Sequence, residues 1–118
     1  MKFNDSLQGG TAVFHITGKI IGGKETAMFH GRMREYLNLN KKHFVIDLAG
    51  VERLNSVGLG MLISALTAIK NSDGQLRLAN ITDNIESLLT ITRLVTIFET
   101  HDTLDEALGS LPPGCDSH

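Results

Sequence analysis

The sequence feature that most constrains the fold is a short apolar run at residues 44–48, Phe-Val-Ile-Asp-Leu, with polar residues before it. A strand covered on one face alternates between apolar and polar side chains, whereas a nearly unbroken apolar run is typical of a strand covered on both faces. Such strands occur in parallel sheets, whose crossover connections are usually helices. We therefore expect residues 44–48 to form the central strand of an α/β sheet.

Amphipathic helices are predicted on both sides of this run. The helix before it has Glu25 near its start and an apolar face formed by Phe29, Met33, Tyr36 and Leu37. The helix after it covers residues 57–71 and has an apolar stripe formed by Leu59, Leu62, Ile63, Leu66 and Ile69. A third helix begins at Asp83, which forms a capping box with Glu86, and Asp102 caps a fourth.

The remaining segments predict the other strands. Residues 3–7 and 12–17 flank a Gly-Gly turn and predict a hairpin, while residues 75–79 and 95–98 predict two later strands. The predicted fold class is therefore α/β, with a mixed, mostly parallel central sheet of about four to five strands, preceded by a β-hairpin, and about four helices. Residues 1–111 are expected to form one domain, followed by a disordered tail at residues 112–118.

Charge and composition exclude several classes of function. The chain has 11 Lys and Arg against 13 Asp and Glu, a net charge of −2, which favours neither nucleic acid nor an anionic membrane as a partner. The one cysteine, Cys115, indicates a reducing compartment. Since no signal-peptide pattern and no apolar run of about 18 residues is present, we expect a cytoplasmic protein. The five histidines show no ligand spacing, so we expect no metal and no cofactor.

The most informative segment is residues 55–60, Asn-Ser-Val-Gly-Leu-Gly, which joins the central strand to the second predicted helix. Each glycine inside a helix costs about 0.5 to 1 kcal/mol relative to alanine, so two glycines in the first turns weaken the helix where it must nucleate. Something must approach the backbone closely there. The approaching group could be another part of the fold, a phosphate or a partner protein.

Enzyme and nucleotide motifs fail when they are tested against this segment. A dinucleotide-binding fingerprint would need a third glycine where Ile63 stands and an acid where Asn80 stands. A phosphoaspartate receiver would need an acidic pair after the first strand to accompany Asp47, which we interpret instead as a strand-end hydrogen-bond acceptor. No catalytic triad can be assembled from spacing, so we expect no enzyme, and a nucleotide-binding domain remains a remote alternative.

Ser56 stands at the start of the second predicted helix and permits two compatible interpretations. Its hydroxyl can cap the helix, a role that Asn55 could also fill, or it can be a phosphorylation site beside free amide groups. The helix also has a second face without charge, formed by Val57, Met61, Ser64, Ala65 and Ala68. This face is either packed within the fold or a protein-binding patch around the Ser56 turn.

Residues 44–51, 55–60, 76–80 and 96–98 together resemble the STAS family, the sulphate transporter and anti-sigma factor antagonist domains. The resemblance covers nearly the whole chain. It implies a non-catalytic cytoplasmic protein that binds an anti-sigma factor with serine kinase activity. In that family the kinase phosphorylates the serine that aligns with Ser56 and so switches binding off; a PP2C-type phosphatase is a further expected partner, and the chain itself is expected to be a monomer or weak dimer.

The sequence departs from the family motif at three positions. Asn55 replaces the usual Asp, Val57 replaces Ser or Thr, and Ile21 replaces another acid. The resemblance still predicts a partner-binding surface formed by Ile21, Gly22, Asn55, Ser56, Val57, Gly58, Gly60, Met61 and Ser64. The alternative is an unphosphorylated STAS scaffold or a regulatory module of a signalling or transport assembly, in which Ser56 acts only as a helix cap.

Overall fold

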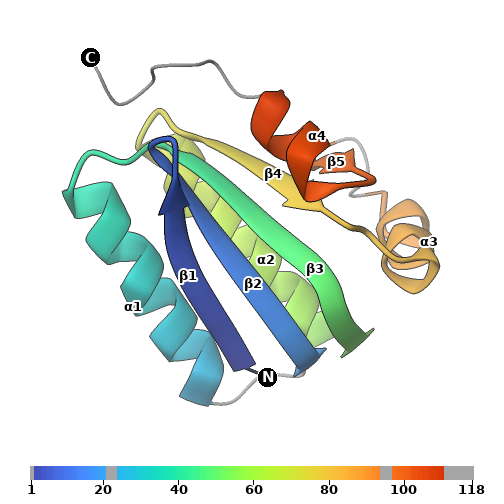
Figure 1. Cartoon of the computed structure of the whole chain (residues 1–118). Coiled ribbons are helices and arrows are strands. Elements are labelled where there is room, and N and C mark those ends of the chain that lie inside the picture. Colours follow the sequence, from blue (N-terminus) through green and yellow to red (C-terminus); the bar gives the residue numbers. More distant parts are fainter. Residues whose placement is uncertain (1, 21–23, 94–96, 111–118) are drawn as a thin grey trace.

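A five-stranded sheet organises the computed structural model, which describes residues 2–20, 24–93 and 97–110 (Figure 1). The elements in chain order are β1 (Lys2–Gln8), β2 (Thr11–Ile20), α1 (Lys24–Asn38), β3 (His43–Leu54), α2 (Ser56–Asn71), β4 (Gln75–Ala79), α3 (Asp83–Ile91), β5 (Glu99–His101) and α4 (Leu104–Gly109). None of the helices in these ranges is long and apolar enough to span a membrane.

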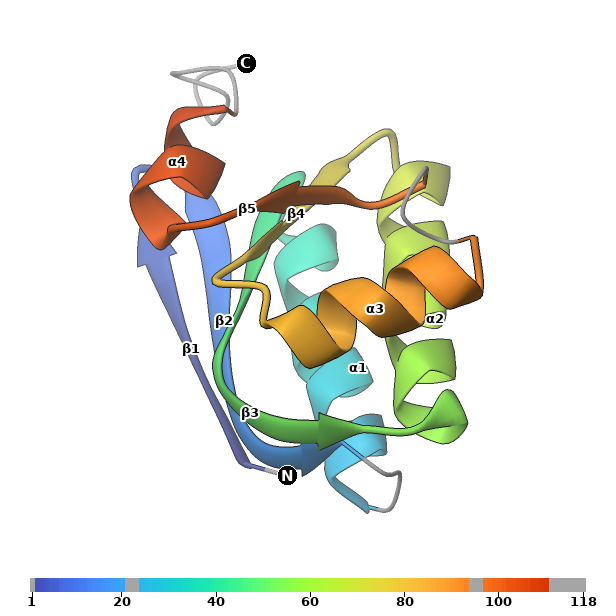
Figure 2. The same cartoon turned by 90° about the vertical axis from the view of Figure 1, so that its right-hand side faces the viewer.

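The strands lie side by side in the same order as in the sequence, β1-β2-β3-β4-β5. β1 pairs antiparallel with β2, and every later pair is parallel. Figure 2 shows α1, α2 and α3 on one side of the sheet and α4 beside the other. The predicted α/β class, the antiparallel hairpin and the parallel strands that follow it are therefore confirmed.

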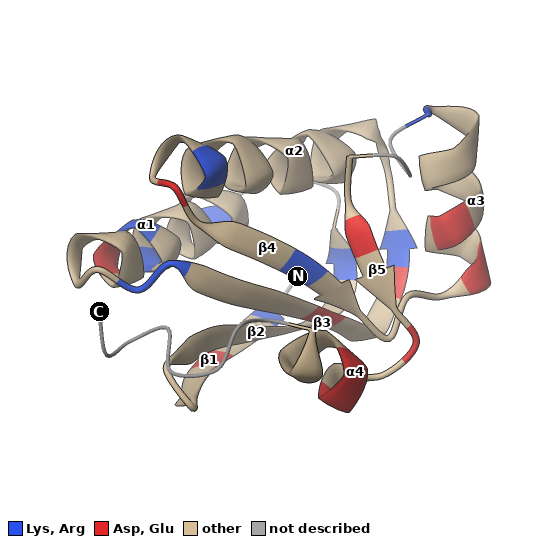
Figure 3. Ribbon diagram, turned by 90° about the horizontal axis from the view of Figure 1, so that it is seen from above, with Lys and Arg blue, Asp and Glu red and all other residues tan. Residues whose placement is uncertain are grey.

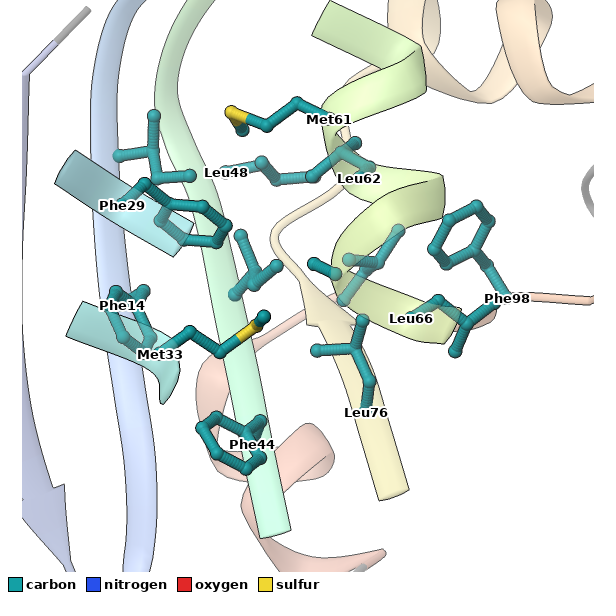
Figure 4. Packing of buried hydrophobic residues seen from close by; sticks show 14 of the residues in the cluster. Phe14, Phe29, Met33, Phe44, Leu48, Met61, Leu62, Leu66, Leu76 and Phe98 are labelled. Atoms are coloured by element: carbon teal, nitrogen blue, oxygen red, sulfur yellow. The ribbon is translucent and has the colours of Figure 1, made fainter. Parts of the chain in front are cut away.

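Residues 44–48 lie in β3 at the centre of the sheet, and they are covered on both faces. Phe14, Phe44 and Leu76, from three adjacent strands, belong to the main core with residues of α1 and α2 (Figure 4). On the opposite face, Val45 belongs to a second buried cluster that includes Ala107 of α4. Successive side chains of a strand point to opposite faces, so the apolar run reflects burial from both sides.

Two strands are longer than predicted and one lies elsewhere. β2 continues through Gly18 to Ile20, and β3 continues past residue 48 to Leu54. The predicted strand at residues 95–98 is wrong within the described residues, because Ile97 and Phe98 form a turn and a bend before β5. Phe98 instead inserts its buried side chain into the main core. Residues 94–96 and the predicted tail at 112–118 lie outside the described residues.

The caps of the last two helices each lie one residue from the predicted position. The hydroxyl of Thr82, not the carboxylate of Asp83, accepts the hydrogen bond from the backbone N–H of Ile85. In the same way the hydroxyl of Thr103, not Asp102, accepts from the backbone N–H of Glu106. Both threonines have extended backbone conformations, as a residue just before a helix requires.

Asp47 is a structural carboxylate within β3 and does not end the strand as predicted. Its oxygens accept hydrogen bonds from the side chain of Asn80 at 2.8 Å, from the backbone N–H of Ala49 at 3.0 Å and from the ring of His15 at 2.8 Å. Burial alone would raise the pKa of Asp47, but these hydrogen bonds outweigh it and lower the pKa below its ordinary value. The partners of its oxygens are all residues of the fold itself, so Asp47 has a structural role.

Buried histidine makes the stability of the fold sensitive to acid. His43 is buried at the start of β3, and its Nδ1 atom has no hydrogen-bond partner. Burial and the nearby charge of Arg77 lower its pKa, so the folded state favours the neutral ring. The stabilisation from this neutral ring is present above the ordinary histidine pKa of about 6.5 and is lost as the pH falls below it.

We therefore expect the wild-type protein to lose free energy of unfolding between pH 7.5 and pH 5.5, and His43→Leu to lose less over the same interval. Urea denaturation at the two pH values measures this difference. Equal losses in the two proteins would contradict the role assigned to His43.

Candidate functional site

The turn between β3 and α2 places the side chain of Ser56 on the surface. Asn55 is the N-cap of α2, and its side-chain oxygen accepts a hydrogen bond from the backbone N–H of Gly58 at 2.9 Å. Ser56 is the first residue of the helix and is exposed. The interpretation of Ser56 as the cap is therefore wrong, because Asn55 already fills that role. The hydroxyl of Ser56 is left accessible from solvent.

Gly58 is a glycine because another part of the fold approaches it. A Cβ atom at this position would lie 2.1 Å from the carbonyl oxygen of Ile20, at the end of β2. The same carbonyl accepts a hydrogen bond from the backbone N–H of Asn55 at 3.3 Å. Another part of the fold, a phosphate or a partner protein could each require a glycine. At Gly58 the group that requires it is part of the fold, the backbone of β2.

Gly60 has no such explanation within the described residues. It lies exposed in the second turn of α2, and a Cβ atom built on it would meet nothing within 4 Å. Alanine would favour the helix by about 0.5 to 1 kcal/mol at such a position. The two glycines of the motif therefore differ: the fold requires Gly58, whereas the fold leaves open space around Gly60.

The predicted second face of α2 is divided between the core and the surface. Val57 and Ser64 are exposed, with 57% of Val57 accessible, and Ala68 is half-buried. Met61 and Ala65 are buried in the main core, and the carbonyl oxygen of Met61 accepts a hydrogen bond from the ring of His30 in α1. Packing therefore explains part of this face, and the remaining part is free to contact a partner.

The predicted partner-binding residues are only partly brought together on this surface. Asn55, Ser56, Val57, Gly60 and Ser64 are exposed at the start of α2. Met61, only 3% exposed, and the buried Gly58 are corrections to the prediction, because a partner cannot reach their side-chain positions. The predictions for Ile21 and Gly22 fall outside the described residues.

Two basic residues, which the sequence analysis missed, lie at the same end of the sheet. Lys19 of β2 and Arg53 of β3 are exposed and opposite one another in the parallel register. Among the described residues neither has an ion-pair partner. These two side chains place positive charge at this end of the sheet, next to the exposed carboxylate of Glu52 in β3. The predicted strands ended before Lys19 and Arg53, so the pairing of these two residues could not be expected from the sequence.

The described residues contain no group of three or more His, Cys, Asp and Glu side chains that could hold a metal ion. The surface at the start of α2 has an exposed hydroxyl, an open glycine and uncharged side chains, and Lys19 and Arg53 lie in the ends of the two strands that lead to it. It is suited to contact with a macromolecule and to modification at Ser56.

Comparison with known proteins identifies the family. A family model described as STAS domain matches residues 3–107. The chain belongs to the STAS domain family. A Thermotoga maritima protein named "Putative anti-sigma factor antagonist" is 31% identical to this STAS domain over 74 residues, which cover 63% of this chain and 66% of the relative. The aligned region thus spans just under two thirds of that relative's length.

Solved structures share the fold of this STAS domain. A crystal structure from Thermotoga maritima, with the same description, has a TM-score of 0.80 at 23% identity and covers 92% of both chains. The Bacillus protein SpoIIAA in its phosphorylated form has a TM-score of 0.75 at 12% identity, covering 94% of this chain and 100% of that one. At these identities the similarity establishes the fold alone.

The contrast between the two glycines gives a testable prediction about stability. Gly58→Ala should destabilise the protein by about 3 kcal/mol or more, because the new methyl group overlaps a backbone carbonyl that cannot move without disrupting β2. Gly60→Ala should stabilise it by about 0.5 to 1 kcal/mol, because the methyl group enters open space and favours the helix. Urea denaturation of the two variants measures both changes. Similar effects at the two positions would contradict the assignment.

Proposed function

We propose that this STAS domain is a phosphorylation-switched anti-sigma factor antagonist that acts in the cytoplasm without catalytic activity. The surface around Ser56 binds an anti-sigma factor with serine kinase activity. Phosphorylation of Ser56 by that partner ends the complex, and a PP2C-type phosphatase restores the binding-competent form. The single observation that carries this proposal is the exposed Ser56 hydroxyl beside Gly60, a glycine that its own fold does not require.

Close approach of a partner gives Gly60 a role. A side chain there would project from the first turns of α2 and hold another surface away from the helix, whereas glycine permits contact with the backbone. The neighbouring exposed residues Val57 and Ser64 are small and uncharged. Burial of such residues in an interface costs little desolvation free energy, since no charge has to be removed from water.

The electrostatics of the turn are compatible with a phosphate on Ser56. The start of α2 carries the positive end of the helix dipole, and no acidic residue lies in its first turn. Lys19 and Arg53 add positive charge at the same end of the sheet. A phosphate adds about −1.5 to −2 charges, so the folded domain accommodates it while the surface presented to a partner, uncharged from residue 54 to residue 69, becomes negative.

The substitution of Asn55 for the usual acid is explained by its cap. The amide oxygen of Asn55 accepts the hydrogen bond from the Gly58 N–H that a carboxylate would accept, so the geometry of the turn survives the loss of the charge. The absence of the acid also leaves less negative charge near a phosphate on Ser56. The relatives are consistent with the proposal: the fold is shared with SpoIIAA, whose structures include an unphosphorylated and a phosphorylated form.

Phosphorylation is tested by incubating the purified protein with its anti-sigma kinase and ATP, followed by mass spectrometry. We expect one phosphate on Ser56 and none on Ser56→Ala. Ser56→Asp should weaken binding to the kinase at least tenfold, whereas Ser56→Asn, which has nearly the same shape without the charge, should bind more tightly than Ser56→Asp. All three variants should melt within a few degrees of the wild type, because Ser56 is exposed and is not the cap.

The opposite result would favour the unphosphorylated scaffold. In that case the wild-type protein takes no phosphate, and Ser56→Asp and Ser56→Asn bind partners equally.

Gly60 provides a second, independent test of the binding surface. Gly60→Leu should weaken binding to the anti-sigma factor at least tenfold while leaving the protein at least as stable as the wild type, because the side chain enters space that only a partner would fill. Thr67→Leu, an exposed position about two turns further along α2, is the matched control and should bind normally. Isothermal titration calorimetry measures the affinities. Equal binding by the two variants would place the interface elsewhere.

A further inference from the structure

The second half of β3 has an unpaired edge. β4 pairs with β3 only from His43 to Asp47, whereas β3 continues to Leu54 with β2 on its other side. No described strand pairs with residues 48–54 on the β4 side, and after β4 the chain leaves the sheet to form α3 (Figures 1 and 2). Apart from the N–H of Ala49, which donates to Asp47, this stretch of β3 therefore offers backbone N–H and C=O groups to a further strand.

A groove of about 370 Å³ lies between this edge and α3. Its apolar lining consists of Val51, Leu54, Ile85, Leu88 and Ile91. Ile91 is 79% exposed, so this large apolar side chain at the end of α3 is available to an occupant of the groove. The groove thus combines a row of unpaired backbone groups with apolar walls, the two features that bind an extended peptide.

A bulge in β3 shapes the groove. Gly18 pairs with Val51 and Lys19 pairs with Arg53, so Glu52 is an extra residue between two successive pairings. As a result Val51 and Leu54 pack against the main core, while both Glu52 and Arg53 are exposed and line the groove. The bulge thus places the carboxylate of Glu52 and the guanidinium of Arg53 together at the groove.

Three carboxylates and one guanidinium line the groove and the hollow that adjoins it. Glu52 lines it on the strand side, beside Arg53. On the helix side, a second, shallower hollow shares Ser87 and Ile91 with the groove and is also lined by Asp83 and Glu86 (acidic positions of α3 are red in Figure 3). None of these three carboxylates is in an ion pair with a described residue. A segment that carries lysine or arginine complements this charge.

We propose that the groove between β3 and α3 binds an extended, basic segment of a partner protein, which adds to the free edge of β3 as a further strand. Alternate side chains of the segment would enter the apolar groove, and the side chains between them would carry the positive charge. The groove lies next to the turn that carries Ser56 in the chain, because Leu54 lines it and Asn55 follows. The inference does not require phosphorylation of Ser56 or an anti-sigma factor as the partner.

The test uses a random decapeptide library displayed on phage and selected on the immobilised full-length protein. We expect enriched peptides in which apolar residues alternate with positions rich in lysine and arginine. Ser87→Trp, which fills the groove from an exposed position of α3, should weaken their binding at least tenfold. Thr67→Trp is the control, since Thr67 is exposed on α2 and lines neither the groove nor the neighbouring hollow, and it should bind as the wild type does.

A second measurement locates the peptide without any substitution. Nuclear magnetic resonance of the wild-type protein should show amide groups of residues 48–54 becoming protected from hydrogen exchange when an enriched peptide binds. Binding should also weaken as salt is added, because the attraction is partly between charges at the surface. Failure to enrich any alternating basic peptide, equal binding by the two tryptophan variants, or protection confined to residues outside β3 and α3 would each overturn the proposal.

Discussion

The carbonyl group of Ile20 is the contact on which the arrangement of the candidate site depends. Its oxygen accepts a hydrogen bond from the backbone N–H of Asn55 and leaves no room for a side chain at Gly58. The first turn of α2 therefore lies directly against the end of β2. This contact and the Asn55 cap fix the turn, and the side chain of Ser56 is exposed on it. The close contact between α2 and β2 and the exposed hydroxyl of Ser56 therefore both depend on this one packing constraint.

Much of the fold could be predicted because its elements carry local signals. The nearly unbroken apolar run of β3 indicated burial on both faces, and the spacing of Phe29, Met33 and Tyr36 indicated α1. The ends of the strands could not be predicted in the same way. Past residue 48, β3 contains a glycine, exposed polar residues and a bulge, so its side chains no longer follow the period of two on which strand prediction relies. Phe98 was assigned to a strand because it is apolar, although tertiary packing buries it from a bend.

The candidate site was predicted in outline, and its details needed tertiary contacts. The two glycines correctly indicated that another group approaches the backbone of α2. Only the position of Ile20 in the structure shows that this group lies against Gly58 and not against Gly60. Both Asn55 and Ser56 are good capping residues, and the choice between them depends on where the helix begins. Met61 was counted as accessible because the helical pattern shows one buried stripe, whereas α2 is buried over a wider arc that includes contact with α1.

The unequal lengths of two neighbouring strands connect the Ser56 surface with the groove beside α3. β3 has 12 residues and β4 has 5, so β3 extends well past the point where β4 ends. The extension carries the turn of Asn55 past the end of β4, where Ser56 is accessible, and it leaves the edge of β3 on the β4 side unpaired. An exposed edge promotes unwanted association between chains, so proteins usually shorten or cover it. Here the bulge and the charges of Glu52 and Arg53 limit that risk, although the edge itself stays unpaired. This arrangement is expected where a strand edge binds one kind of extended segment and not others.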